Sequence, residues 1–426
     1  MRRIDRMRPF LRNERGVALP LALMAFVVLG ALSAALLSVG SSEVQIASNH
    51  LRDTQARFLA EAGLEHSFNT LRITPSLMTS ANANLQTIAY NTQFGGVGSS
   101  VGNYVASYQA AGPNTVRVVS TGNSVVGGSV KGTKVLRATM STYFHSNDAI
   151  LTNDDLTVGG NTSVLQTAGL CGNVHTNKEL HVSGSVSIIG SATASNDYET
   201  TGNPSVGAGS GGDKPRHTVP VINPTDFLNV AKASLPADHL FQMKANGQVL
   251  NGSDALITTL ANNGSYCGWS YTSGTPPALA QWTFNGNTFC NGTYYLEGNA
   301  KVVSSPGSDA TPWETTLIAT GDIELAGKPT IGADANYTVH DTLLIAGLDV
   351  KTNGSPSNGY NGLIAAHEQF DLSGNGTFNG YVIGEDASHA SNTVTSSSVS
   401  GSITLTYNCN SNPPLQGPLQ FLSWGL

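Results

Sequence analysis

The chain has 426 residues, a formal net charge of -7, and only 12% charged residues, whereas an ordinary soluble domain has about 25%. Gly contributes 47 residues, and no basic patch interleaved with aromatic residues follows residue 72, which argues against a nucleic-acid partner. The composition is typical of an extracellular β protein with many turns, built as two or three units or as one elongated repeat.

The first forty residues combine a basic start with a long apolar segment. Residues 17–39 contain no charged side chain, and a run of that length crosses a bilayer as a helix. Basic residues before such a helix hold the N-terminus in the cytoplasm. Six arginines precede it, opposed by Asp5 and Glu14: Arg2, Arg3, Arg6, Arg8, Arg12 and Arg15.

Pro20 bears on where the mature chain begins. Proline breaks a helix interior but is tolerated in the first turn, where its missing N–H has no helical partner. Cleavage after Gly16 would make Pro20 the fourth residue of the new chain. A secretory signal peptide cut near Ala35 and an uncleaved single-pass anchor remain alternatives, although the apolar run continues through Ala35.

The apolar segment passes without a turn signal into an amphipathic one that ends before Pro75. We therefore expect a single helix over residues 17–72, roughly 84 Å long at about 1.5 Å per residue. Its outer half presents Leu51, Phe58 and Ala62 toward a partner surface.

Two motifs carry a resemblance to a known family. The residues ERG before the apolar run and QARFLAEAGLE at residues 55–65 resemble the N-terminal domain of the PilX family of type IV pilus assembly proteins. The resemblance covers about the first seventy residues. It implies cleavage after Gly16 by a prepilin peptidase and methylation of Val17, which leaves a basic leader over residues 1–16.

Leu21 departs from the pattern of most major pilins, which carry Glu at the fifth mature position. This departure is familiar in the PilX group and in type II secretion tip pseudopilins, so the resemblance implies a subunit at or near a filament tip. A carboxylate in lipid is unfavourable when it has no partner, and a subunit with no neighbour ahead of it does not need one.

The outer region is predicted to be mostly β, which makes the fold class α+β. Alternating apolar and polar residues over 101–110, 114–121 and 134–144 predict a small antiparallel meander within a pilin-like module at 73–145. Over residues 146–426 short apolar alternations ending in Gly or Asn recur irregularly. They favour a β-helix or solenoid with an insertion near 191–282; a β-sandwich is the alternative.

All four cysteines follow the apolar segment, and their spacing does not suit zinc. We favour a disulfide between Cys267 and Cys290 in an oxidising compartment, although four cysteines allow three connectivities. The alternative is that all four cysteines are buried free thiols.

The acidic residues of the outer region are the candidates for catalysis. Four acidic pairs lie one to three residues apart, where solvated turns are the commoner explanation: Asp154 with Asp155, Asp322 with Glu324, Glu368 with Asp371, and Glu385 with Asp386. The histidines, among them His175, His181, His340 and His367, have no metal-binding spacing, and calcium at Asp154 and Asp155 lacks the EF-hand pattern. We therefore expect no enzyme, no catalytic or metal site and no cofactor.

The leading hypothesis is a minor pilin-like structural protein. It would enter the inner membrane with its N-terminus cytoplasmic and its bulk periplasmic, then join a pilus at the cell surface. Its partners would be other pilins, the prepilin peptidase, and a surface glycan or host ligand if it is adhesive. The alternatives are a membrane-tethered β-helix enzyme or binding module for surface polysaccharide, and a plain anchored adhesin.

Overall fold

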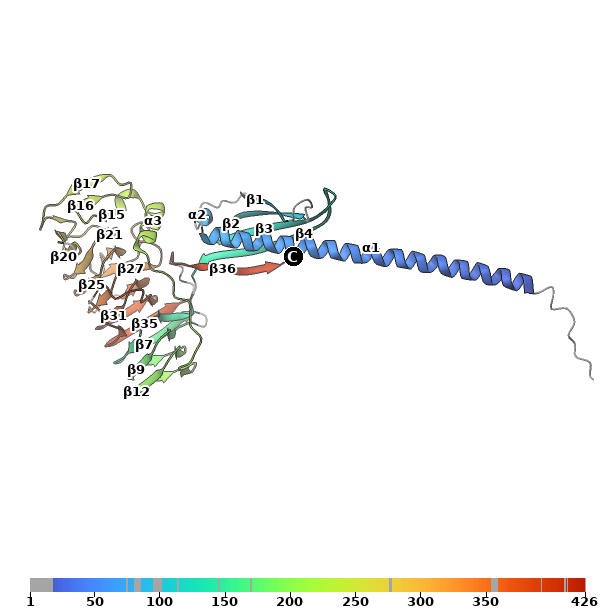
Figure 1. Ribbon diagram of the computed structural model, residues 1–426. Coiled ribbons are helices and arrows are strands. Elements are labelled where there is room, and N and C mark those ends of the chain that lie inside the picture. Colours follow the sequence, from blue (N-terminus) through green and yellow to red (C-terminus); the bar gives the residue numbers. More distant parts are fainter. Residues whose placement is uncertain are drawn as a thin grey trace, which may run out of the picture. The chain divides into compact units, whose positions relative to one another are not determined.

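The computed structural model describes residues 18–73, 76–79, 86–94, 102–112, 115–144, 146–168, 171–275, 278–353, 359–391, 393–409, 411 and 413–425 (Figure 1). It divides into two compact units. The helix unit comprises Met1–Ser141 together with Leu419–Leu426, and the coil unit comprises Thr142–Pro418. The expected order of a long helix, a small antiparallel sheet and then mostly strands is confirmed.

The helix unit is built on one uninterrupted helix, α1 (Ala18–Ile73), followed by the short α2 (Ser76–Thr79). A five-stranded sheet has the order β1-β2-β3-β4-β36. Its first four strands pair antiparallel in sequence order. The strands are β1 (Gln86–Phe94), β2 (Gly102–Gly112), β3 (Thr115–Val126), β4 (Ser129–Tyr143) and β36 (Gln416–Gly425). Because β36 completes this sheet, the coil unit is inserted between two neighbouring strands of the helix unit.

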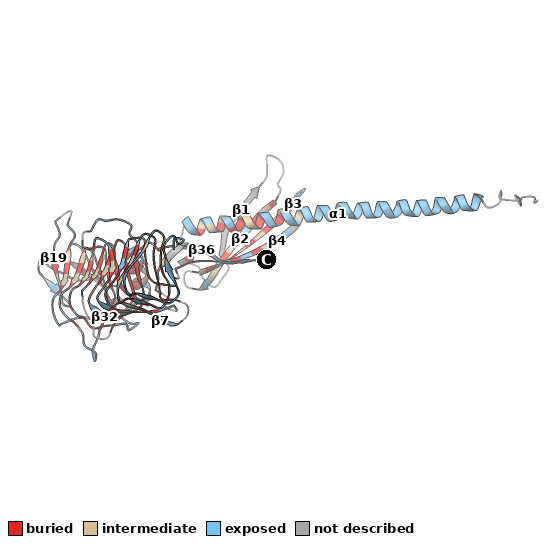
Figure 2. Ribbon diagram, turned by 90° about the horizontal axis from the view of Figure 1, so that it is seen from below, coloured by how far each residue is buried: buried red, intermediate tan, exposed pale blue. Residues whose placement is uncertain are grey.

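Small residues let the outer half of α1 lie close to the sheet (Figure 2). A Cβ added at Gly122 on β3 would stand 2.1 Å from the Ala56 carbonyl oxygen, and one at Gly63 on α1 would stand 2.1 Å from Ser120 Oγ. Glycine is required at both positions because the opposing backbone and side chain occupy that space. The core of the unit is apolar: Ala60, Leu64, Leu71, Met78, Ala106, Tyr108, Val116, Val118, Leu136, Ala138, Met140 and Leu419.

In the coil unit each turn of the chain contributes strands to up to three sheets, and strands of successive turns pair in parallel. The first sheet contains β5 (Asp148–Thr152), β8 (Asn173–Thr176), β11 (Ala192–Ala194), β14 (Ser210–Gly211), β15 (Leu240–Met243), β16 (Gln248–Leu250), β17 (Leu256–Thr259), β21 (Thr293–Leu296), β24 (Leu317–Ala319), β27 (Thr342–Ala346), β30 (Leu363–Ala366) and β33 (Val382–Gly384).

The second sheet contains β6 (Leu156–Val158), β9 (Leu180–Gly184), β12 (Tyr198–Gly202), β18 (Ser265–Tyr266), β19 (Trp269–Thr272), β20 (Gln281–Phe284), β22 (Asn299–Val302), β25 (Ile323–Leu325), β28 (Val350–Thr352), β31 (Phe370–Leu372) and β34 (Ser397–Val399). The third contains β7 (Ser163–Ala168), β10 (Ser187–Ile188), β13 (Ser205–Val206), β29 (Tyr360–Asn361), β32 (Asn375–Asn379) and β35 (Ser402–Asn408). A further pair, β23 (Trp313–Glu314) with β26 (Ile331–Gly332), is also parallel.

The order of the turns along the stack is not the order of the sequence. From β5 the chain winds to β14 at one end, returns through α3 (Pro224–Ser234) and the 3-10 turn η2 (Ala237–His239), and restarts at β15 near the other end. It then winds back until β33, β34 and β35 pair with β5, β6 and β7. We call this junction of the last turn with the first the seam.

The insertion predicted near 191–282 differs in part from the structure. Residues 192–211 continue the regular turns as β11 to β14, paired in parallel with the preceding turn. The extra structure within the predicted range is instead α3, capped by the Asn223 side chain with Pro224 in its first turn, and the antiparallel strands β16 to β20.

Candidate assembly surface

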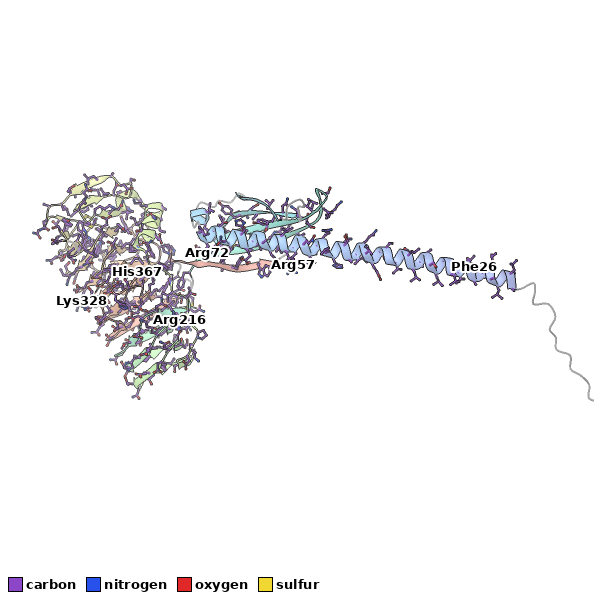
Figure 3. All side chains as sticks on the ribbon, viewed as in Figure 1. Phe26, Arg57, Arg72, Arg216, Lys328 and His367 are labelled. Atoms are coloured by element: carbon purple, nitrogen blue, oxygen red, sulfur yellow. A yellow bond between two sulfur atoms is a disulfide. The ribbon has the colours of Figure 1, made fainter. Side chains whose placement is uncertain are left out.

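The inner half of α1 has no contact that buries it. Residues 18–51 are all exposed, and Phe26 projects from the helix with 76% of its surface accessible (Figure 3). In the described part of the chain α1 is the one helix long and apolar enough to cross a membrane, with mean hydropathy 2.4 over 18 residues. Such a surface is unfavourable in water, so lipid or other apolar helices must cover it.

Pro20 lies in the first described turn of α1. Leu21 follows it with 63% of its surface exposed, so a side chain at this position faces whatever surrounds the helix. The predicted processing residues Gly16 and Val17, and the leader over residues 1–16, lie outside the described residues.

The sheet packs on a different face of the outer half of α1 from the one that carries Leu51 and Phe58. Leu51 and Phe58 are 52% and 64% exposed, and Ala62 is partly buried. The sheet instead covers a stripe of mostly small residues: Ala56, Leu59, Ala60, Gly63, Leu64, Ser67 and Leu71. The recurrence of Ala56, Ala60, Gly63 and Ser67 every three or four residues was a signal for close packing in the sequence. Leu51 and Phe58 therefore stay available to a partner.

Polar contacts fix the helix on its sheet. His66 Nδ1 lies 2.5 Å from Tyr104 Oη on β2, and Ser124 Oγ on β3 donates to Gln55 Oε1 at 3.0 Å. An exposed ion pair joins Lys134 Nζ to Asp53 at 3.2 Å, where screening by solvent leaves little net stabilisation.

The C-terminal strand β36 adds exposed aromatic side chains beside α1. Phe421 stacks on Phe68 with ring centroids 4.8 Å apart, while Trp424 is 61% exposed. A hollow of about 380 Å³ lies between them and the helix, lined by Glu61, Leu64, Glu65, Phe421 and Trp424. This apolar hollow with two carboxylates lies wholly within the helix unit.

The acidic residues that were candidates for catalysis in the coil unit have structural partners. The candidates Asp154, Asp322 and Glu368 occupy equivalent turns, each between a strand of the first sheet and the next strand of the second, and Asp349, which the sequence did not single out, occupies a fourth. We call these four residues the carboxylate row. The connection between β33 and β34 supplies donors to Asp322, Asp349 and Glu368, and Ser397, the first residue of β34, supplies the donor to Asp154.

These donors are Thr393 Oγ1 to Asp322, Val394 N to Asp349, Ser397 N to Asp154, and Ser388 Oγ, Ala390 N and Ser391 N to Glu368. Burial raises the pKa of Asp349, although the amides of Val394 and Gln369 oppose the shift. Burial also acts to raise the pKa of Glu368, but its three donors outweigh that effect and the pKa is lowered.

The second members of the predicted acidic pairs are engaged separately. Asp155 accepts from Glu179 N, and Glu324 pairs with Lys301 Nζ at 2.7 Å. Asp371 accepts from Ser398 Oγ. Glu385 contacts His367 Nδ1 at 2.6 Å, and Asp386 contacts Lys178 Nζ at 2.8 Å. The hydrogen bond to Glu385 raises the pKa of His367.

His175 and His217 form a contact that sequence reasoning missed. Their rings stack with centroids 3.7 Å apart, and His217 Nδ1 lies 2.7 Å from Asp148 Oδ2. Burial, with His217 nearby, lowers the pKa of His175. The bond to Asp148 raises the pKa of His217. These contacts attach the return segment to the first turns of the stack. His181 makes a separate contact, in which its Nε2 lies 3.1 Å from Thr201 Oγ1.

Within the described residues no group of three or more His, Cys, Asp or Glu is arranged to hold a metal ion. The tryptophans of the coil unit, which could have offered sugar-stacking surfaces, lie instead in the interior: Trp269, Trp282 and Trp313 are fully buried, and Tyr271 is 5% exposed. They pack with Phe284 and Tyr294 near the β18 to β20 end of the coil unit.

Both disulfides lie within the coil unit. Cys267 is bonded to Cys290, the pair favoured from the sequence, and Cys171 is bonded to Cys409. No described cysteine is free.

Comparison with known proteins gives little to add. No protein-family model matches the chain, so the PilX resemblance has no support from that comparison, and no curated protein matches it either. Among solved structures, the crystal structure of the competence-associated pilin ComZ from Thermus thermophilus matches 88% of this chain and 97% of that chain. The two are 16% identical with a TM-score of 0.28, values at which the match bears on neither fold nor function.

Proposed function

We propose that this chain is a minor pilin-like subunit of a type IV pilus or a related filament, of the kind that the PilX resemblance implies. The observation that carries the proposal is the division of α1 into two halves. One half is apolar and exposed on all sides, while one face of the other half packs on a five-stranded sheet.

This division suits a subunit that changes its surroundings. The inner half of α1 is stable in a bilayer because every backbone polar group is satisfied within the helix. When the subunit leaves the bilayer, apolar helices of neighbouring subunits must replace the lipid. Leu51 and Phe58 extend the uncovered surface beyond the apolar run, so the filament contact would continue along the outer half of the helix.

Processing and position follow from the residues at the start of the helix. A prepilin peptidase would cut after Gly16 in the inner membrane and methylate Val17, placing the coil unit in the periplasm and later on the pilus. Leu21 in place of the usual glutamate favours a place at or near the filament tip, where the subunit would assist assembly or adhesion.

The coil unit would serve as the outer body. Its turns of three strands, paired in parallel from turn to turn, are the arrangement of a parallel β-helix, and we propose that class for it. In register, Leu317, Leu344, Ile364 and Val382 stack through its interior. A tethered enzyme would need acidic groups available to a substrate, whereas both members of each predicted acidic pair are engaged by donors within the protein.

Intact-mass analysis of the mature protein tests this proposal, after coexpression with a prepilin peptidase. We expect a chain that begins at Val17 with one added methyl group, and no processing of Gly16→Leu. Ala35→Leu is the matched control, because it blocks a signal-peptidase site but leaves the prepilin site unchanged. A mature chain that begins at Met1 or near Ala35 would contradict the proposal.

A further inference from the structure

A polar groove of about 450 Å³ lies on the third side of the coil unit and has no role in the function proposed above. One wall is the segment between β26 and β27, and the floor is the outer face of β29, β32 and β35. Its lining includes Ala333, Ala335, His340, Asp341, Asn361 and Asn379.

The floor repeats one polar side chain per turn. Asn361 is in register with Asn379, and Asn379 is in register with Thr406. Paired strands lie about 4.8 Å apart, so the three side chains form a regular row. Asn379 Nδ2 donates to Asn361 Oδ1 at 2.9 Å. A carboxamide has two donors and an oxygen with two lone pairs, so this single bond leaves the row with donors and acceptors for a ligand.

Both walls are held in place by contacts within the protein. On one side Thr338 Oγ1 donates to the Asp334 carbonyl oxygen at 2.9 Å, and the Asp334 amide donates to Glu314 Oε2 at 2.7 Å. On the other side the segment with Asn408 and Ser411 contains Cys409, which is bonded to Cys171. The groove is therefore formed before any ligand arrives, which lowers the entropy lost on binding.

The lining chemistry selects the ligand class. Its ionisable side chains are those of His340 and Asp341, which contact each other at 3.2 Å, and the remaining polar groups are amides and hydroxyls. Nucleic acid requires a cationic surface, which this lining lacks. An extended peptide adds to a sheet edge, whereas the floor is a sheet face whose backbone groups pair between turns.

We infer that the groove binds a neutral oligosaccharide. Sugar hydroxyls both donate and accept hydrogen bonds, as carboxamides do, and the exposed Ala333 and Ala335 offer apolar surface to the C–H faces of the sugar rings. The inference rests on the coil unit alone and is independent of processing or filament assembly.

Calorimetric titration of the full chain tests it, in a detergent without a sugar headgroup. The probes are cellohexaose, chitohexaose and maltohexaose as neutral chains, with polygalacturonate as an anionic comparator. We expect saturable binding of at least one neutral probe. Binding should weaken at least tenfold in Asn361→Ala/Asn379→Ala, which removes the amide row, and in Ala335→Trp, which fills the groove.

Asn203→Ala is the matched control, because Asn203 is equally exposed but lies between β12 and β13, outside the groove. It should bind as the unsubstituted chain does. Unchanged melting temperatures establish that the variants fold, and if the double variant does not fold, Ala335→Trp decides alone. Absence of binding to all three neutral probes, equal binding by the groove variants, or tighter binding of polygalacturonate would overturn the inference.

Discussion

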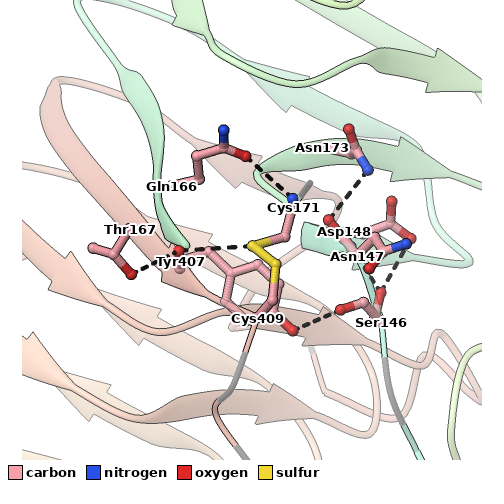
Figure 4. Close-up of a disulfide and its surroundings, with 9 residues drawn as sticks. All are labelled: Ser146, Asn147, Asp148, Gln166, Thr167, Cys171, Asn173, Tyr407 and Cys409. Carbon is pink, nitrogen blue, oxygen red and sulfur yellow. Dashed lines mark hydrogen bonds between the residues drawn. A yellow bond between two sulfur atoms is a disulfide. The ribbon is translucent and has the colours of Figure 1, made fainter. Parts of the chain in front are cut away.

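Cys171 and Cys409 are bonded although 238 residues separate them in the chain, and their bond closes the seam of the coil unit (Figure 4). Cys409 follows β35 in the last turn, and Cys171 follows β7 in the first. Nearby, Tyr407 Oη donates to the Ser146 carbonyl oxygen at 2.6 Å. The seam therefore joins the two ends of the inserted coil unit covalently as well as by strand pairing.

Removing this disulfide is expected to destabilise the coil unit more than removing the other one. In the chain-entropy treatment a cross-link stabilises in proportion to the logarithm of the loop it closes. Because the separations are 238 and 23 residues, the Cys171–Cys409 bond is expected to stabilise the fold by about 2 kcal/mol more than the Cys267–Cys290 bond. Urea unfolding of Cys171→Ser/Cys409→Ser measures the loss, with Cys267→Ser/Cys290→Ser as the matched variant. An equal or smaller loss at the seam would refute this ranking.

Local patterns in the sequence predicted the strands but not their partners. The recurring apolar alternations over residues 146–426 predict short strands of a repeat, and residues 370–384, one such stretch, form β31, β32 and β33. The pairing of β33 with β5 joins residues more than two hundred positions apart. Alternation of side chains fixes which face of a strand is buried, but it carries no information about which distant strand lies beside it. For the same reason β36 was placed with the outer region, whereas it completes the sheet of the helix unit.

The acidic residues show a second limit of sequence reasoning. Glu368 and Asp154 were interpreted as turn residues in solvent, yet they are 0% and 4% exposed. Their donors come from residues 388–397, which reach Asp154 across a separation of 243 positions. Burial of a charge is permitted only by such donors, and stacking of the turns brings them together. In contrast, the apolar inner half of α1 was predicted from composition alone because it depends on no tertiary contact.

Gly122→Val is expected to disrupt the helix unit. Its Cβ would stand 2.1 Å from the Ala56 carbonyl oxygen and 2.4 Å from the Ala60 nitrogen, both backbone atoms that no rotamer change can move. We expect the free energy of unfolding to fall by more than about 3 kcal/mol, which is at the upper end for an overpacked contact. Thermal unfolding with limited proteolysis of the sheet measures it. Gly425→Ala is the control on β36, where an added Cβ meets nothing within 4 Å. Similar stability of the two variants would show that α1 does not pack as described.

The pKa values of the two stacked histidines are expected to be shifted in opposite directions from that of an ordinary histidine. The folded pKa of His217 is raised by Asp148, so its contribution to stability is complete below the unfolded pKa of about 6.5 and is lost as pH rises through the folded value. The folded pKa of His175 is lowered, so its neutral form contributes stability at high pH that is lost as pH falls below about 6.5.

Nuclear magnetic resonance of chains labelled at the histidine ring carbon measures both values. Asp148→Asn should lower the pKa of His217, because the neutral amide removes the carboxylate partner. His217→Gln should raise the pKa of His175 part of the way to its ordinary value, since burial remains. A His217 pKa that does not respond to Asp148→Asn would contradict the assigned contact.

Glu368→Gln is expected to loosen the connection between β33 and β34. The carboxylate accepts hydrogen bonds from Ser388 Oγ, Ala390 N and Ser391 N, and a carboxamide nitrogen cannot replace an oxygen as acceptor. A buried donor left without a partner costs about 1–3 kcal/mol. Hydrogen exchange at the amides of Ala390 and Ser391 should therefore quicken at neutral pH.

Acid should reproduce this effect in the unsubstituted chain. The folded pKa of Glu368 is lowered, so its contribution is present above the unfolded pKa of about 4.5 and is lost as pH falls through the folded value. After correction for the intrinsic dependence of exchange on pH, protection of the Ala390 and Ser391 amides should fall in that acidic range in the unsubstituted chain. In Glu368→Gln the protection of these amides should not change over the same range. Glu199→Gln, at an exposed position on β12, should leave protection unchanged at both pH values. If at neutral pH the amides of Ala390 and Ser391 exchange as fast in Glu199→Gln as in Glu368→Gln, the contacts of Glu368 do not hold this connection.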